Sequence, residues 1–170
     1  LPKATAIVNP NLQETKFESP FLAGVGVAYY LMAVVRATLR AESYFESHNL
    51  TEPNLADWLD LVALGTVADV VPLDRNNRIL VYQGLRRIRL GHLRPGMQAL
   101  IEIADRRLET LSAQDLGFAV GPRLNAAGRL DDIGLGIQCL LAGDLESARS
   151  MAVALDELNK VRRSIEDEMN

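Results

Sequence analysis

The stretch that organises this chain reads Leu59-Asp-Leu-Val-Ala-Leu-Gly-Thr-Val-Ala-Asp-Val-Val-Pro-Leu73. Its second half is almost wholly apolar and encloses one carboxylate, Asp69. Because an ionised carboxylate buried without compensation costs several kcal/mol, Asp69 is predicted to meet a cation, backbone N–H groups or a metal ion. Gly65 and Thr66 predict a turn that presents this side chain at the edge of a core. The pattern leaves two roles open for Asp69, a structural one as a cap or buried ion pair and a functional one.

The composition is that of a globular domain rather than a disordered chain. The chain has 170 residues, of which 48% are hydrophobic and 24% charged. Cys139 is the single cysteine, so no disulfide can form within the chain, and a reducing cytoplasm fits best. The longest apolar stretch free of charge, residues 22–35, is shorter than the roughly 18 to 20 residues that cross a bilayer. We therefore expect a buried helix there and no membrane span.

Charge is distributed unevenly along the chain. Residues 75–130 carry ten arginines, no lysine and four acidic side chains, whereas the flanks 1–74 and 131–170 each carry four basic and nine acidic side chains. A basic centre between acidic flanks favours a polyanionic ligand, although charged runs are often only solvated faces. The planar guanidinium of arginine suits bidentate contact with phosphate.

The periodicity of apolar residues predicts a mostly helical chain with one short strand. The β-branched run 4–8 is typical of a buried strand before a turn. Helices are expected over residues 21–41, 55–64, 78–90, 95–104, 112–121, 133–142 and 145–168. The first of these is apolar nearly all round and is expected to be buried on most sides. The last would reach about 35 Å, long enough to connect two domains.

Short polar signals predict where these helices begin and end. The expected capping residues are Ser19, Asn54, Asp74, Ser112 with Asp115, and Asp131 with Asp132, and the expected helix-ending glycines are Gly91 and Gly121. Asp60 is interpreted as an exposed or capping acid.

A second segment with functional character reads Gly121-Pro-Arg-Leu-Asn-Ala-Ala-Gly-Arg-Leu-Asp-Asp132. We expect it to be irregular, with small residues that allow a ligand to approach the backbone. Arg123, Asn125 and Arg129 could together hold a phosphate. Arginines in such segments also make ordinary ion pairs, and the sequence alone leaves both roles open.

Four segments together carry a family resemblance that matches in order and spacing and extends from Leu1 into the final helix. They are Leu1-Pro-Lys-Ala-Thr-Ala-Ile-Val-Asn-Pro-Asn11, Leu22-Ala-Gly-Val-Gly-Val-Ala28, Leu64-Gly-Thr-Val-Ala-Asp-Val-Val-Pro-Leu73 and Gly121-Pro-Arg-Leu-Asn-Ala-Ala-Gly-Arg-Leu130. They resemble the single-stranded-DNA exonucleases of the DHH phosphoesterase superfamily. The residue at Pro20 departs from the pattern expected there.

The resemblance implies an α/β fold, of which this chain would be the mostly helical C-terminal portion of the catalytic domain, residues 1–143, followed by a long connecting helix, residues 144–170. It implies a manganese- or magnesium-dependent enzyme that removes nucleotides from the 5′ end of single-stranded DNA in repair and recombination, with repair proteins as candidate partners. It makes Asp69 a catalytic metal ligand and turns Arg123 toward the substrate phosphates, with Asn125 and Arg129 as helpers.

The remaining metal ligands of that family have no match in the sequence. No Asp-x-Asp or Asp-His-His occurs, and the two histidines, His48 and His92, are far apart. A two-metal site needs several hard oxygen ligands, so we expect the others upstream of Leu1 and a second nucleic-acid-binding domain downstream. Two other interpretations stay open: a DHH phosphoesterase acting on short oligonucleotides or cyclic dinucleotides, and a helical scaffold without chemistry.

Overall fold

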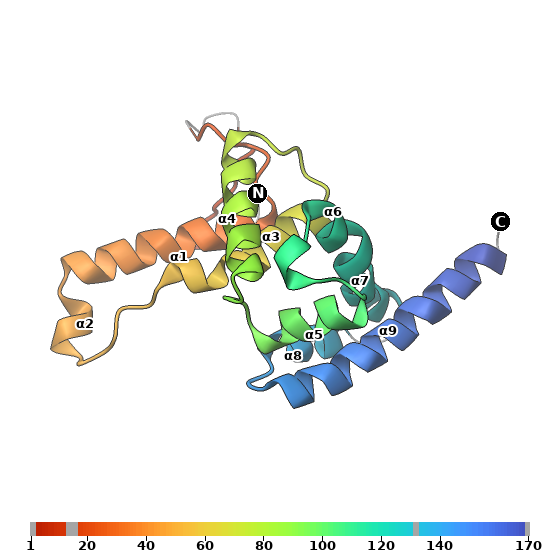
Figure 1. Cartoon of the computed structure of the whole chain (residues 1–170). Helices are drawn as coiled ribbons and strands as arrows, with labels where there is room; N and C mark the ends of the chain where they lie inside the picture. Colours follow the sequence, from red (N-terminus) through yellow and green to blue (C-terminus); the bar gives the residue numbers. More distant parts are fainter. Residues whose placement is uncertain (1–2, 13–16, 131–132, 169–170) are drawn as a thin grey trace.

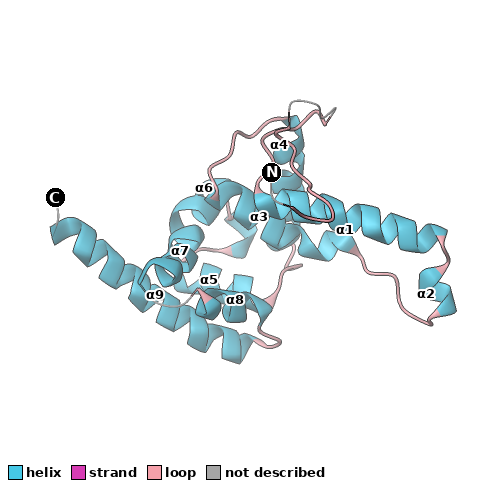
Figure 2. Ribbon diagram, turned by 180° about the vertical axis from the view of Figure 1, so that it is seen from behind, coloured by secondary structure: helices cyan, strands magenta, loops and turns pink. Residues whose placement is uncertain are grey.

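The computed structural model describes residues 3–12, 17–130 and 133–168, with the side chains of 129 and 130 left out, and these residues contain helices and loops but no strand (Figures 1 and 2). The elements in chain order are α1 (Gly24–Ala41), α2 (Tyr44–Ser47), the 3₁₀ helix η1 (Leu55–Trp58), α3 (Leu59–Ala68), α4 (Arg75–Arg89), α5 (Pro95–Ile103), the 3₁₀ helix η2 (Leu108–Thr110), α6 (Ala113–Asp115), the π-helix η3 (Leu116–Val120), α7 (Gly121–Leu130), α8 (Gly134–Leu141) and α9 (Leu145–Glu168). The prediction of a mostly helical chain is confirmed.

The strand predicted over residues 4–8 is not formed. These residues run without ladder hydrogen bonds, and Val8 is 60% exposed. A strand exists only where a neighbouring strand accepts and donates its backbone hydrogen bonds, and the described residues offer none. The α/β class therefore rests on the resemblance alone.

The centre of the fold is α3, which packs against α1, α4 and the π-helix η3. Its contact with α4 is close enough to require a glycine. A Cβ atom added to Gly84 would lie 2.2 Å from the carbonyl oxygen of Leu59 and 2.5 Å from Cβ of Ala63. The backbones of α3 and α4 therefore touch, and this contact fixes where α4 lies relative to the end of α3.

The main core lies between α3, α4, α5, η3, α8 and α9. It is built from side chains that are almost fully buried, among them Ile88, Met97, Leu100, Leu116 and Leu155. Cys139 belongs to it, and burial raises the pKa of its thiol to about 11. Helix α9 has the predicted bounds and packs on α5, α7 and α8, while its C-terminal end extends away from the body (Figure 1).

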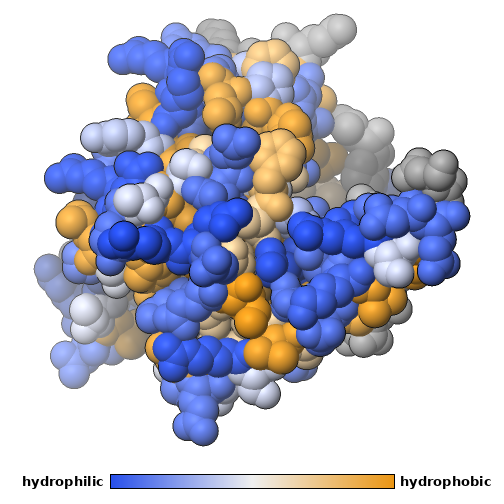
Figure 3. All heavy atoms as spheres, turned by 45° about the vertical axis from the view of Figure 1, so that its right-hand side comes forward, coloured by the Kyte–Doolittle hydropathy of each residue, from blue (hydrophilic) through white to orange (hydrophobic). Residues whose placement is uncertain are grey.

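Helix α1 is more exposed than its sequence predicts. It packs against α3 and η1, and its Tyr30 ring contacts the ring of Phe17, whereas Leu31, Val34 and Val35 are about half exposed or more. It projects from the body with α2 at its far end (Figures 1 and 2). A helix that is apolar all round needs neighbours all round, and the described residues cover only part of its surface. Other hydrophobic side chains also lie open among hydrophilic ones on the face shown in Figure 3.

Several capping predictions are confirmed and two are wrong. Asn54 and Asp74 accept N-cap hydrogen bonds, Ser112 and Asp115 form a capping box, and Gly91 follows α4 with φ +80°. Ser19 does not cap α1, which begins at Gly24. Gly121 does not end a helix but begins α7. The predicted cap at Asp131 and Asp132 lies outside the described residues. No helix in the described part of the chain is long and apolar enough to cross a membrane.

Candidate metal and nucleic-acid site

Asp69 lies at the C-terminal end of α3, and it is exposed, which corrects the prediction of a buried carboxylate. Gly65 and Thr66 do not form a turn, because α3 continues through them to Ala68, and the backbone N–H of Asp69 donates to the carbonyl of Gly65 over 3.0 Å. Within the described part of the chain the Asp69 carboxylate makes no hydrogen bond or ion pair. It is therefore a hard oxygen donor held on a packed helix and open to a ligand.

The backbone is strained immediately after this carboxylate. Val70 has φ +53° and its side chain is 86% exposed. A left-handed conformation costs an L-residue about 1–2 kcal/mol, and a β-branched side chain is rarely found there. Such strain persists only where the surrounding structure imposes it.

The surrounding structure that imposes this conformation is an anchor centred on Asn77. Its buried side-chain amide donates to the carbonyls of Pro72 and Phe21, both over 2.9 Å, and Pro72 also accepts from the backbone N–H of Asp74 over 3.0 Å. The chain is thus fixed at Ala68 by α3 and at Pro72 by the anchor, which leaves a two-residue connection after Asp69. This geometry fixes the position of the backbone at Asp69.

Asp74 completes the anchor. One carboxylate oxygen accepts from the backbone N–H of Asn77 over 2.8 Å, and the other accepts from the hydroxyl of Ser19 over 2.6 Å. Burial raises the pKa of Asp74, but the hydrogen bonds from Asn77, Ser19 and Asn76 and the nearby guanidinium of Arg78 outweigh it, so the pKa lies below its ordinary value. The anchor therefore stays charged and intact at neutral pH.

Relieving the strain at Val70 is expected to stabilise the protein. Val70→Asn should raise the free energy of unfolding by about 0.5–1 kcal/mol, because asparagine tolerates the left-handed region and the valine side chain buries little. Thermal melting of the intact protein measures this gain. Val34→Asn, at a valine that is 62% exposed in the right-handed helix α1, is the matched control and should give no gain. Equal melting shifts for the two variants would show that Val70 stores no strain.

The second predicted site segment is helical rather than irregular. The chain passes from α6 through the π-helix η3, where the N–H of Gly121 donates to the carbonyl of Leu116, and continues as α7. Proline is normally excluded from a helix interior because it has no N–H. The π-turn immediately before it changes the local hydrogen-bond pattern, which accommodates Pro122 within one continuous helical segment.

Helix α7 begins against the end of α3, so the two segments singled out in the sequence meet. A Cβ atom added to Gly121 would lie 3.3 Å from Cβ of Ala68, the residue before Asp69. Ala68, Gly121 and the exposed Asn125 line one cavity of about 300 Å³. The structure therefore brings Asn125 to the same region as Asp69. Arg129 lies further along α7, and its side chain is outside the described atoms.

Arg123 points to the other side of α7. Its Nε donates to Oδ1 of Asp156 over 2.8 Å, a terminal nitrogen lies 2.7 Å from the same oxygen, and the other donates to the carbonyl of Ala119 over 2.5 Å. The Arg123 side chain is only 12% exposed. Arg123 thus joins α7 to α9 through an ordinary ion pair, which is the alternative role that the sequence leaves open for it.

The buried carboxylate of the organising stretch is Asp60, which corrects its interpretation as an exposed or capping acid. Asp60 is 1% exposed and lies 3.1 Å from Nε of Arg94, whose backbone N–H also donates to it. The guanidinium of Arg94 in turn lies over the ring of Trp58, 4.7 Å from its centroid. The signal that could have found this pair is helical spacing, because Asp60 shares the buried side of α3 with Ala63 and Leu64.

Within the described residues no group of three or more acidic, histidine or cysteine side chains could hold a metal ion. A metal site that includes Asp69 would therefore need further ligands from outside the described residues.

The relatives and solved structures described below all carry the same protein name. No family model matches it. It is 59% identical over 169 residues to the single-stranded-DNA-specific exonuclease RecJ of Salmonella typhimurium, covering 99% of this chain and 29% of the relative. It is 58% identical over 169 residues to RecJ of Escherichia coli, again covering 99% and 29%. RecJ of Bacillus subtilis is 33% identical over 169 residues, covering 99% of this chain and 20% of the relative.

Solved structures agree. A crystal structure of exonuclease RecJ bound to manganese superposes with a TM-score of 0.76 at 33% identity, over 95% of this chain and 38% of that one. RecJ of Thermus thermophilus in complex with Mg²⁺ superposes with a TM-score of 0.72 at 31% identity, over 92% of this chain and 23% of that one. The chain spans less than a third of the curated relatives it matches.

Proposed function

Because nearly the whole chain is similar to RecJ, we propose that it forms one part of a metal-dependent exonuclease that hydrolyses single-stranded DNA from the 5′ end. The observation that carries the proposal is the identity of 59% over 169 residues to a single-stranded-DNA-specific exonuclease. We further propose that the enzyme works in the cytoplasm, in DNA repair and recombination, with repair proteins as partners. The match favours this substrate over cyclic dinucleotides or short oligonucleotides.

In this proposal Asp69 is a ligand of a manganese or magnesium site. Its carboxylate is a hard oxygen donor that is open to solvent, has no partner within the described residues and is held by the Asn77 anchor. Bound ions of this kind activate a water molecule and stabilise the charge on the leaving oxygen. Asp69 would contribute one fixed ligand, while the other ligands come from outside the described residues.

The proposed DNA side of α7 is the side that carries Asn125, with Arg129 as the cationic contact. Asn125 is exposed and lines the cavity that Ala68 also lines. An amide and a guanidinium both hydrogen-bond phosphate oxygens without reading sequence. The contacts of Arg123 support a bracing role for that residue beside this surface.

Arg123→Ala is expected to destabilise the protein without changing how DNA binding depends on salt. The substitution leaves Asp156, which is 7% exposed, with Lys160 as its remaining cation, so the free energy of unfolding should fall by about 2–4 kcal/mol. Melting of the intact protein, and affinity of a hydrolysis-inactive variant for single-stranded DNA across a salt series, measure the two quantities. If Arg123 contacts a phosphate instead, the salt slope will fall by roughly 0.7.

The activity itself is tested with the intact protein that contains this chain. It should release nucleotides from single-stranded DNA labelled at the 5′ end when Mn²⁺ is present, and chelation should stop the release. The 170-residue chain alone should release none, because it supplies only part of the metal site. Metal-dependent release by this chain alone would show that the site lies elsewhere, and no release by the intact protein would overturn the proposed activity.

A further inference from the structure

Helix α4 presents one continuous exposed side made of arginines and a tyrosine. We call it the α4 arginine face, and it consists of Arg75, Arg78, Tyr82, Arg86 and Arg89, all of which are exposed. Spacings of three and four residues place them on the same side of the helix. The face is about 21 Å long, and Tyr82 in its middle is 60% exposed.

The arginines of this face make no ion pair with the described residues. Within the described residues the guanidinium groups of Arg75, Arg78 and Arg86 make no hydrogen bond or ion pair, although that of Arg78 lies near enough to Asp74 to lower the pKa of its carboxyl group. Arg89 uses only Nε, which donates to the carbonyl of Leu111 over 2.8 Å. An ordinary solvated helix face mixes both signs of charge. This one has no acid in α4, where Arg87 on another side takes the nearby carboxylate of Asp57.

Such a face costs stability, because like charges three or four residues apart destabilise a helix. The chain has a net charge of −4, so a face with four arginines and no ion pair to a described residue is a local concentration of the opposite charge. Guanidinium groups interleaved with an exposed aromatic ring are the combination that binds single-stranded nucleic acid: the cations follow the phosphates and the ring stacks on a base.

The face is tied to the candidate site by the chain itself. Arg75 follows Asp69 by six residues, so their Cα atoms are at most about 21 Å apart. The connection between them is the anchored loop held by Asn77 and Asp74. A strand with one end at Asp69 could therefore reach the start of the face within a few nucleotides and continue along it.

We propose that the α4 arginine face binds the single-stranded DNA beyond the nucleotide being hydrolysed, with Arg75, Arg78 and Arg86 on phosphates and Tyr82 stacked on a base. The proposal rests on the proposed exonuclease function. It makes α4 a second DNA-binding element, separate from Asn125 and Arg129 on α7. A longer strand gains affinity from it, and a strand too short to leave the site gains none.

The test uses the intact enzyme made inactive by Asp69→Asn, with a single-stranded 20-mer and a tetranucleotide as probes. The double variant Arg75→Gln, Arg86→Gln should bind the 20-mer at least about fivefold more weakly and lower its salt slope by about 1.4, two contacts at roughly 0.7 each. The loss should be larger for the 20-mer than for the tetranucleotide. The lysine variants of the same two arginines should keep most of the slope, because the charges remain.

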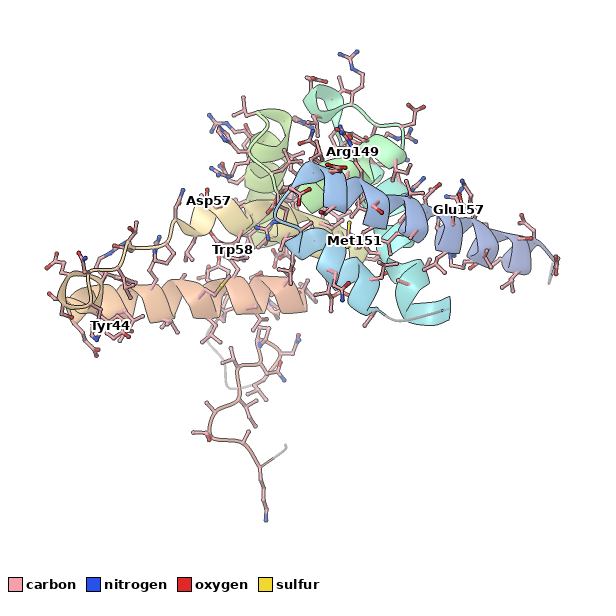
Figure 4. The ribbon with its side chains drawn as sticks, turned by 90° about the horizontal axis from the view of Figure 1, so that it is seen from below. Tyr44, Asp57, Trp58, Arg149, Met151 and Glu157 are labelled. Carbon is pink, nitrogen blue, oxygen red and sulfur yellow. The ribbon has the colours of Figure 1, made fainter. Side chains whose placement is uncertain are left out.

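Tyr82→Ala separates stacking from charge. It should weaken binding of the 20-mer by about fivefold or more while leaving the salt slope unchanged, since a stacked ring releases no counterions. Arg149→Gln is the matched control for charge loss: Arg149 is 57% exposed on α9 and pairs with Glu102, and both affinity and slope should stay at their original values (Figure 4).

If the folded double variant binds the 20-mer with unchanged affinity and unchanged salt slope, the inference is overturned. An acidic protein partner would then be the alternative ligand of the α4 arginine face. That outcome differs from a failure of the proposed function. If the activity is wrong, the enzyme with its native α4 face will neither bind nor degrade single-stranded DNA, and this is measured first.

Discussion

Replacing Asp69 by asparagine is expected to slow nucleotide release from single-stranded DNA by roughly a thousandfold or more, about 4 kcal/mol of transition-state stabilisation. Asparagine keeps the shape of the side chain and removes the anionic oxygen that a hard divalent cation requires. The fold should survive, because the Asp69 carboxylate is exposed and makes no hydrogen bond or ion pair with a described residue. Single-turnover rates at saturating DNA measure the effect without a contribution from product release.

A binding measurement distinguishes a lost ligand from a damaged fold. Titration of the intact enzyme with Mn²⁺ should show weaker binding in Asp69→Asn, whereas its melting temperature without metal should match that of the parent enzyme. Asp105→Asn is the matched control, because Asp105 is likewise an exposed aspartate just past the end of a helix, α5. Near-normal turnover by a folded Asp69→Asn enzyme would remove Asp69 from the metal site.

The largest expected effect on stability comes from Asp60. Asp60→Ala should lower the free energy of unfolding by about 3–5 kcal/mol, because it leaves the guanidinium of Arg94, which is 15% exposed, without its carboxylate. The backbone N–H groups of Arg94 and Leu61 lose their acceptor at the same time. Denaturant unfolding of the intact protein, followed by a signal from this region such as Trp58 fluorescence, measures the change.

Two further variants show whether burial is the cause. The side chain of Asp57 is 59% exposed and pairs with Arg87, and Asp57 lies next to Trp58 (Figure 4). Asp57→Ala should lower the free energy of unfolding by no more than about 1 kcal/mol, because an exposed ion pair contributes little. The double variant Asp60→Leu, Arg94→Met should be less destabilised than Asp60→Ala, because it leaves no unpaired charge. If Asp57→Ala and Asp60→Ala lower the free energy of unfolding equally, burial of the Asp60–Arg94 pair is not the cause of the loss.

Short-range signals in the sequence predict the local structure well. The N-cap of α4 at Asp74, the capping box of Ser112 with Asp115, the left-handed Gly91 and the bounds of α9 are all as expected. Each depends on residues at most four positions apart, or on a periodic pattern that one helix carries by itself. Such signals do not need a partner elsewhere in the chain.

The order and spacing of the four quoted segments likewise indicate the exonuclease family without any tertiary information, and the 59% identity agrees with them. The sequence also shows the concentration of arginine in residues 75–130. Only the packed helices show which of these arginines are already paired, as Arg94 and Arg123 are, and which remain open, as Arg75 and Arg86 do.

The composition of the stretch 59–73 is enough to show that a buried carboxylate there needs a cation. Which of its two aspartates is buried depends on how the helices pack. It is Asp60 rather than Asp69, because α3 continues to Ala68 and turns Asp60 inward to Arg94, 34 residues away. Arg123 pairs with Asp156, 33 residues away, because α7 packs against α9. Capping is settled within one helical turn, whereas burial and ion pairing between helices depend on how the helices pack, which no short stretch of sequence specifies.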